Sequence, residues 1–133
     1  MRTIHWVWAA SFALFAALLM AHQAGSNAPR KLESGEILKL LKAPRQVLFI
    51  DVREPNEIAV TGTLKDALTI PVGQLEQRLK EVPKDKPVVL YCLAGGRSDQ
   101  AARWCTSHGF AIEAHMGGGI SAWRMHGLPV VTD

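Results

Sequence analysis

Cysteine is scarce in this 133-residue chain, which contains only Cys92 and Cys105. In an exported protein such a pair suggests a disulfide. If residues 98–108 form a helix, however, Cys105 lies roughly 12 Å along the helix axis from Arg97, because each residue adds about 1.5 Å. The Cα atoms of bridged cysteines lie within about 7 Å of each other. We therefore expect the two thiols not to be bonded to each other, and Cys105 to be a core residue.

An excess of charge of one sign is also missing. The chain has 15 basic and 12 acidic residues, a net charge of +3 with neutral histidines, and the basic residues from Arg30 to Arg124 are interleaved with acids. A mixed surface of this kind lacks the positive patch that nucleic-acid binding needs, so we predict no nucleic-acid partner. His108, His115 and His126 do not have the spacing of metal ligands, and we predict no metal site.

Charge is almost absent from the N-terminus. Arg2 is followed by residues 3–28, which contain no Asp, Glu, Lys or Arg, and residues 6–21 are apolar except for one serine. A basic start before such a run is the layout of a secretory signal. No clean A-x-A cleavage site follows, and residues 4–21 approach the ~18–20 apolar residues that cross a bilayer. We interpret residues 1–28 as a signal peptide or an N-terminal membrane anchor, which predicts a domain in the periplasm or cell envelope.

The rest of the chain, roughly 105 residues, is long enough for one domain with a single core. Short apolar runs bounded by Pro, Gly or charged residues predict strands, and segments with apolar residues four apart predict helices between them. We expect strands at residues 47–50, 67–70, 88–91 and 111–115. We expect helices at residues 36–41 with Ser34 as the N-cap, at 54–60, around Leu75 and Leu79, at 98–108 and at 120–126. This alternation predicts an α/β fold over residues 33–131, with a doubly wound, mainly parallel sheet flanked by helices.

The residues with the chemistry of an active site follow the third predicted strand. Cys92 comes directly after residues 88–91, and a loop with two adjacent glycines leads from it into a helix. Ligands bind beyond the carboxyl ends of parallel strands, and the N–H groups of such a loop can curl around an anion. A cysteine that faces them has a lowered pKa and reacts as the thiolate. We predict Cys92 as the nucleophile and the residues after it as the substrate-binding loop: Leu93, Ala94, Gly95, Gly96, Arg97 and Ser98.

Charged residues around this loop have supporting roles in the prediction. Arg97 adds a positive charge that could pair with an anionic substrate or with a nearby carboxylate. Asp51 and Arg53 follow another strand, and we interpret them as a charge pair that fixes the two strand-end loops, with simple surface charges as the alternative. Trp123 is expected to pack the last helix onto the sheet.

Four segments together carry the pattern of a known family. They are Asp51-Val52-Arg53-Glu54-Pro55, Tyr91-Cys92-Leu93-Ala94-Gly95-Gly96-Arg97-Ser98, His108-Gly109-Phe110, and Gly118-Gly119-Ile120-Ser121-Ala122-Trp123 continuing to Gly127-Leu128-Pro129-Val130. In this order they resemble a single-domain rhodanese, most closely the exported sulfurtransferases of bacterial envelopes. The resemblance implies a doubly wound fold, no cofactor, and a persulfide on Cys92 that takes sulfur from a donor such as thiosulfate and gives it to cyanide or a thiol. We expect a monomer.

One segment departs from the family pattern. Where Gly-His-Ile-x-Gly-Ala is usual, this chain has Gly62-Thr63-Leu64-Lys65-Asp66-Ala67. The histidine and the second glycine are missing, which leaves the geometry of the bend before the second strand open.

Two other functions also remain open. A cysteine phosphatase or arsenate reductase needs Cys-x5-Arg, so that a larger loop encloses a phosphoryl group and the arginine clamps its oxygens. Here four residues separate Cys92 from Arg97, and the smaller loop favours a single sulfur atom. The other alternative is a non-catalytic module that binds sulfur or a partner.

Overall fold

All strands of the structure belong to one parallel sheet. The structure is a computed structural model that describes residues 28–42, 47–110 and 112–132. Five strands pair in the order β1-β5-β4-β2-β3, and every pairing is parallel. They are β1 (Arg30–Leu32), β2 (Leu48–Asp51), β3 (Leu68–Thr69), β4 (Val88–Tyr91) and β5 (Ala114–Met116). Of the predicted targeting segment, residues 1–28, the first 27 residues lie outside the described residues.

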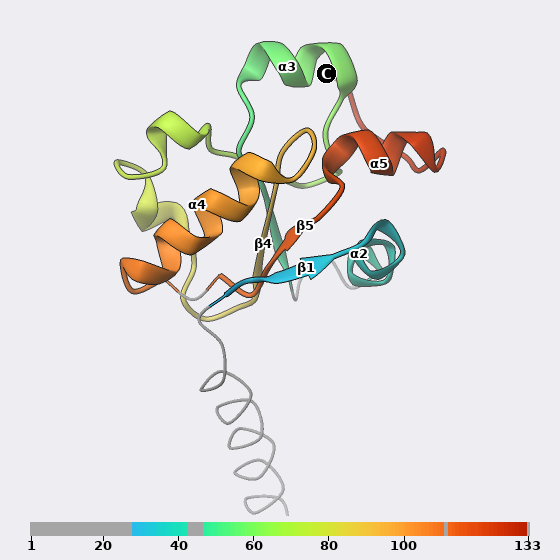
Figure 1. The fold of residues 1–133 in the computed structure, drawn as a ribbon. Coiled ribbons are helices and arrows are strands. Elements are labelled where there is room, and N and C mark those ends of the chain that lie inside the picture. Colours follow the sequence, from blue (N-terminus) through green and yellow to red (C-terminus); the bar gives the residue numbers. More distant parts are fainter. Residues whose placement is uncertain (1–27, 43–46, 111, 133) are drawn as a thin grey trace, which may run out of the picture.

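Helices cover both faces of this sheet (Figure 1). One face carries α4 (Gly96–Ser107) and two 3-10 turns at Val72–Gln74 and Leu79–Glu81, and the other carries α2 (Ser34–Leu41) and α5 (Gly119–Met125). A further helix, α3 (Pro55–Thr61), lies beyond the carboxyl ends of the strands. The predicted α/β fold with a doubly wound parallel sheet is confirmed. None of the helices described is long and apolar enough to cross a membrane.

The central strand β4 divides the core into two clusters. Val88 and Leu90 pack with the residues beneath α4, whereas Val89 and Tyr91 pack on the opposite face with those of α2 and α5. Full burial of one such aliphatic side chain contributes about 1.5–3 kcal/mol. Trp123 of α5 is fully buried in the second cluster, and its indole N–H donates to the Pro129 carbonyl at 2.8 Å. The last helix is thus packed onto the sheet by Trp123, as the sequence predicted.

Strand β1 is the largest difference from the expected fold, because the sequence predicted no strand before residue 47. Its Arg30 and Lys31 side chains are exposed and only Leu32 is buried. A three-residue edge strand of this kind has no apolar run that would mark it. Its pairing with β5, Arg30 beside Ala114, comes from a contact distant in sequence.

Two helical segments also differ in detail. Glu33, not Ser34, is the N-cap of α2, and it forms a capping box with Glu36, so Ser34 is the first helical residue. The helix expected around Leu75 and Leu79 is instead the pair of 3-10 turns. Leu75 still packs into the core with 3 % of its surface exposed, so the apolar spacing indicated the buried face correctly but not the helix type.

Candidate active site

Residues 92–98, which lead from the end of β4 into the first turn of α4, are called here the Cys92 loop. It lies at the carboxyl edge of the sheet, where α3 also stands (Figure 1). Cys92 has 2 % of its surface exposed and belongs to the cluster beneath α4. Leu93 and Ala94 are exposed at the rim, whereas Ser98 is fully buried. The nucleophile candidate is therefore at the floor of the loop, under a small and uncharged rim.

The two glycines of the loop have different roles. Gly95 has a φ of +105°, in the left-handed region that favours glycine. A Cβ at Gly95 would collide with the carbonyl oxygen of Gly117, whereas one at Gly96 would meet nothing within 4 Å. Both were predicted as residues of the substrate-binding loop. The fold requires a glycine at Gly95 and not at Gly96.

Hydrogen-bond donors surround the sulfur of Cys92. The Gly95 N–H donates to Sγ at 3.1 Å, and the Ser98 hydroxyl lies 3.6 Å from Sγ. Burial alone would raise the pKa of the Cys92 thiol. The backbone N–H and hydroxyl of Ser98, with the N–H groups of Gly95 and Ala94, outweigh burial and leave the pKa below its ordinary value. Cys92 thus has the environment of a reactive thiolate.

Helix α5 holds the Cys92 loop from the other side. The N–H of Ile120 donates to the Cys92 carbonyl at 2.9 Å, and the N–H of Ser121 donates to the Leu93 carbonyl at 3.0 Å. The chain can approach this closely because Gly119 has a φ of +62°, and a Cβ there would collide with the Leu93 carbonyl. Gly118 and Gly119 directly precede the helix predicted at residues 120–126, but no sequence pattern indicated that this segment supports the loop.

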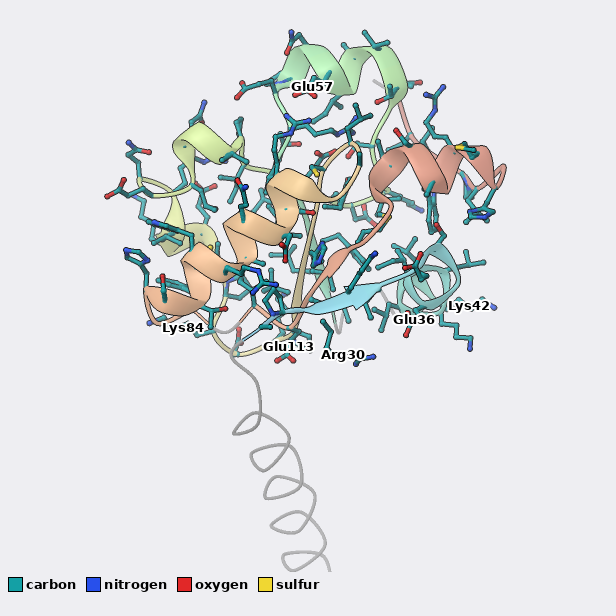
Figure 2. The ribbon with its side chains drawn as sticks, in the orientation of Figure 1. Arg30, Glu36, Lys42, Glu57, Lys84 and Glu113 are labelled. Atoms are coloured by element: carbon teal, nitrogen blue, oxygen red, sulfur yellow. The ribbon has the colours of Figure 1, made fainter. Side chains whose placement is uncertain are left out.

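Arg97 is bound to a carboxylate of α3. Its two terminal nitrogens donate to the Glu57 oxygens at 2.8 and 2.7 Å, and Figure 2 shows Glu57 on α3 above the loop. The guanidinium of Arg97 and the backbone N–H of Glu54 hold the pKa of Glu57 at about 2. The sequence predicted that Arg97 pairs with an anionic substrate or with a nearby carboxylate, and in the structure it pairs with the carboxylate of Glu57. Sequence reasoning did not single out Glu57, because 40 residues separate it from Arg97.

Asp51 and Arg53 form a fully buried ion pair. Arg53 Nε and Nη2 donate to the two carboxylate oxygens of Asp51 at 2.9 and 2.7 Å, and neither side chain is exposed. Arg53 also donates to the Thr61 hydroxyl at 2.6 Å and to the Gly62 carbonyl at 2.8 Å. This burial rules out the alternative that Asp51 and Arg53 are simple surface charges. The pair ties the end of β2 to the end of α3, and in the described part of the chain neither side chain forms a hydrogen bond with the Cys92 loop.

The sequence pattern of this chain matches one protein family. A model of the rhodanese-like domain matches residues 33–126. The chain belongs to the rhodanese-like family. This family assignment covers β2 to β5, the Cys92 loop and the helices that hold it.

Two curated relatives are similar to this chain over most of its length. A protein named "Sulfurtransferase" from Allochromatium vinosum is 40 % identical over 101 residues, which are 76 % of this chain and 94 % of the relative. The tRNA uridine(34) hydroxylase of Escherichia coli is 34 % identical over 119 residues, but this chain spans only 33 % of its length.

Solved structures give the same fold. A rhodanese-related protein from Thermoplasma volcanium superposes with a TM-score of 0.71 and 29 % identity, over 78 % of this chain and 99 % of that one. A protein from Rhodopseudomonas palustris described as a possible tyrosine phosphatase gives a TM-score of 0.70 and 29 % identity, over 77 % of this chain and 85 % of its own.

The bend that departs from the family pattern is closed by other residues. The Thr63 hydroxyl donates to Asp51 at 2.8 Å and lies 2.5 Å from the Tyr91 hydroxyl, which accepts the Leu64 N–H at 3.0 Å. Thr63 thus stands where the family has histidine and links the buried ion pair to β4. Asp66, in place of the second glycine, has a φ of +63°, a conformation that Asp tolerates better than most residues. Thr63 and Asp66 thus form the bend in this chain without the histidine and the second glycine.

Proposed function

We propose that this protein is a sulfurtransferase that carries a sulfane sulfur on Cys92 as a persulfide. The observation that carries the proposal is the setting of Cys92 Sγ, which accepts the Gly95 N–H at 3.1 Å and lies 3.6 Å from the Ser98 hydroxyl. These donors stabilise negative charge, first on the thiolate and then on the sulfur that it accepts. The 40 % identical relative named as a sulfurtransferase supports the same activity.

The transfer takes place in two displacements. The Cys92 thiolate attacks the outer sulfur of a donor such as thiosulfate, a bond forms from Sγ to that sulfur, and the donor's S–S bond breaks so that sulfite leaves with the electron pair. An acceptor, cyanide or a thiolate, then attacks the outer sulfur of the persulfide. The persulfide S–S bond breaks, and Cys92 leaves as the thiolate. One sulfur atom moves, and no external oxidant or reductant is needed.

The acceptor comes from outside the chain. Cys105 is free but fully buried in the core under α4, and burial raises the pKa of its thiol to about 11. A thiol that is neutral and inaccessible cannot attack a persulfide on Cys92. A small external thiol or cyanide therefore completes the cycle.

A phosphatase function fits this site less well. To clamp a phosphoryl group Arg97 would have to leave Glu57, which occupies both of its terminal nitrogens. Only four residues separate Cys92 from Arg97. The resemblance to the possible tyrosine phosphatase of Rhodopseudomonas palustris therefore supports a shared fold rather than shared chemistry.

Mass spectrometry tests the sulfurtransferase proposal directly. Incubation with thiosulfate is expected to add the mass of one sulfur to the protein, and subsequent cyanide to remove it as thiocyanate. Cys92→Ala abolishes both steps, while the matched control Cys105→Ala keeps them. Turnover of an aryl phosphate without sulfur uptake would instead make the protein a phosphatase. Neither reaction, with a Cys92 thiol no more reactive than a free cysteine, would make it a binding module.

We also propose that the domain works in the periplasm or cell envelope. The support is the sequence of residues 1–28, with its basic start and apolar run. Residues 4–21 either leave with a cleaved signal or stay as a membrane anchor. Sequencing the mature N-terminus from separated periplasmic and membrane fractions distinguishes the two, and a full-length cytoplasmic protein would contradict both.

A further inference from the structure

A buried histidine lies behind the Cys92 loop. His115 on β5 has 6 % of its surface exposed, and its Nδ1 is 3.4 Å from the hydroxyl oxygen of Ser98. Its other ring nitrogen, Nε2, is 3.5 Å from a carboxylate oxygen of Asp99. Ser98 Oγ in turn lies 3.6 Å from Cys92 Sγ. The four side chains form a continuous path from Asp99 to the nucleophile, and the mechanism above uses only Cys92 and Ser98.

The Ser98 hydroxyl has one proton and several acceptors within reach. They are the Gly95 carbonyl at 3.1 Å, Cys92 Sγ and, when it carries no proton, His115 Nδ1. A neutral imidazole has a proton on one nitrogen only. The carboxylate of Asp99 favours that proton on Nε2, which leaves Nδ1 as an acceptor that competes with the sulfur. Protonation of His115 turns Nδ1 into a donor to Ser98 Oγ and removes this competition.

We propose that His115 is a positioning residue that acts through Ser98 to adjust how strongly Cys92 is held as a thiolate. Protonated His115 donates a hydrogen bond from Nδ1 to the Ser98 oxygen, which leaves the Ser98 hydroxyl proton free to bond to the Cys92 sulfur. It also places a positive charge one hydroxyl group away from Sγ. Both effects favour the thiolate. By reciprocity, the thiolate favours protonated His115, so the two groups titrate as a linked pair.

Charged groups from two elements face His115. Asp99 and Arg103 come from α4, where they are paired at 3.0 Å, and Lys31 comes from β1, where it lies beside His115 in register. Burial is the largest effect and lowers the pKa of His115. Asp99 opposes it, and Lys31 and Arg103 add to it. His115 is therefore neutral at neutral pH and takes up its proton only in more acidic solution, where a thiol would otherwise lose reactivity.

The pH profile of Cys92 alkylation tests this linkage. The full chain is treated with iodoacetamide across the acidic and neutral range, and the labelled Cys92 peptide is quantified by mass. For the wild type, the plot of alkylation rate against pH is expected to show a shoulder on its acidic side. For His115→Gln, we expect a single one-proton curve, with alkylation roughly two- to tenfold slower than in the wild type at the acidic end. The exposed control His126→Gln keeps the shoulder. Superimposable profiles for His115→Gln and the wild type would overturn the proposal.

A second measurement covers the case in which His115→Gln does not fold. Ser98→Ala leaves His115 in place but is expected to remove the shoulder, because the path to the sulfur is cut. Long-range 1H–15N spectra of the wild type are expected to show the neutral imidazole protonated on Nε2. A proton on Nδ1 instead, or a shoulder retained in Ser98→Ala, would contradict the mechanism.

The inference deepens the proposed function, since it concerns the same thiolate. Its readout is alkylation and not sulfur transfer, so the two can fail separately. A shoulder without sulfur uptake would leave the linkage standing and remove the sulfurtransferase.

Discussion

Single residues of the Cys92 loop determine where its donors point. Gly95 supplies an N–H that donates to the sulfur at 3.1 Å, and it can do so because its left-handed conformation and missing Cβ let the backbone pass the Gly117 carbonyl. Gly96 beside it starts α4 in open space. Adjacent glycines with such different surroundings make a matched pair of substitution sites.

Gly95→Ala and Gly96→Ala are expected to differ strongly in their effect on stability. An added Cβ at Gly95 overlaps backbone and strains a positive φ, so we expect the free energy of unfolding to fall by roughly 2–4 kcal/mol. The displaced N–H would also raise the pKa of Cys92. At Gly96 the same change fills open space in a first helical turn and alters stability by less than about 1 kcal/mol. Urea unfolding with a parallel thiolate titration measures both, and equal losses from the two variants would contradict this account.

At the residue scale, the sequence alone predicted where the residues of this loop lie. Cys92, Gly95, Arg97 and Ser98 lie in one unbroken segment after a buried strand, so their proximity is given by the chain itself. The sequence could not show that a glycine is required at position 95 and not at position 96. That difference arises from the carbonyl of Gly117, which follows β5 and is distant in sequence. His115 was weighed only as a metal ligand, since nothing local indicates that it reaches Ser98.

Two helices hold the loop at the scale of elements. α5 donates N–H groups to the carbonyls of Cys92 and Leu93, and α3 binds Arg97 through Glu57. The sequence predicted both helices, at residues 54–60 and 120–126, within one residue of their observed ends. Their contacts with the loop are not local, and neither is the pairing of edge strand β1 with β5. The positions of these two helices were thus predictable, and their contacts with the loop were not.

Glu57→Gln tests whether α3 screens the charge of Arg97. Loss of the carboxylate weakens the pair and leaves the mouth of the site one charge more positive. We expect the ratio of alkylation rates for anionic iodoacetate over neutral iodoacetamide to rise roughly two- to fivefold at low salt and less at high salt. Because the pair is partly exposed, stability should change by less than about 1 kcal/mol.

Glu54→Gln is the matched control for this prediction. It removes the same charge from the start of the same helix but from a residue that, within the described ranges, forms no ion pair with Arg97, so the alkylation ratio should change less. An unchanged ratio in Glu57→Gln would show that Glu57 does not screen Arg97 from anions.

For the molecule as a whole, one hydrophobic cluster holds both thiols under opposite conditions. Cys92 and Cys105 belong to the same core beneath α4. Cys92 lies at its edge among N–H donors, which lower the pKa of the thiol, while Cys105 lies inside, where burial raises the pKa from 9.0 to about 11. The fold therefore makes one cysteine reactive and the other inert, and these shifts must also appear in its stability.

The alkaline limb of the stability curve is expected to depend on these two residues with opposite signs. A thiol whose pKa is raised in the fold stabilises it below the pKa of the unfolded chain. The Cys105 contribution therefore decreases between about pH 9 and pH 11, by up to about 1.4 kcal/mol per pH unit. A thiol whose pKa is lowered adds stability as pH rises, as Cys92 does. Urea unfolding from pH 7 to 11 should thus give a shallower decline for Cys105→Ala and a steeper one for Cys92→Ala. Parallel curves would mean that the two thiols titrate alike in the fold, which the contrast between N–H donors and apolar neighbours does not allow.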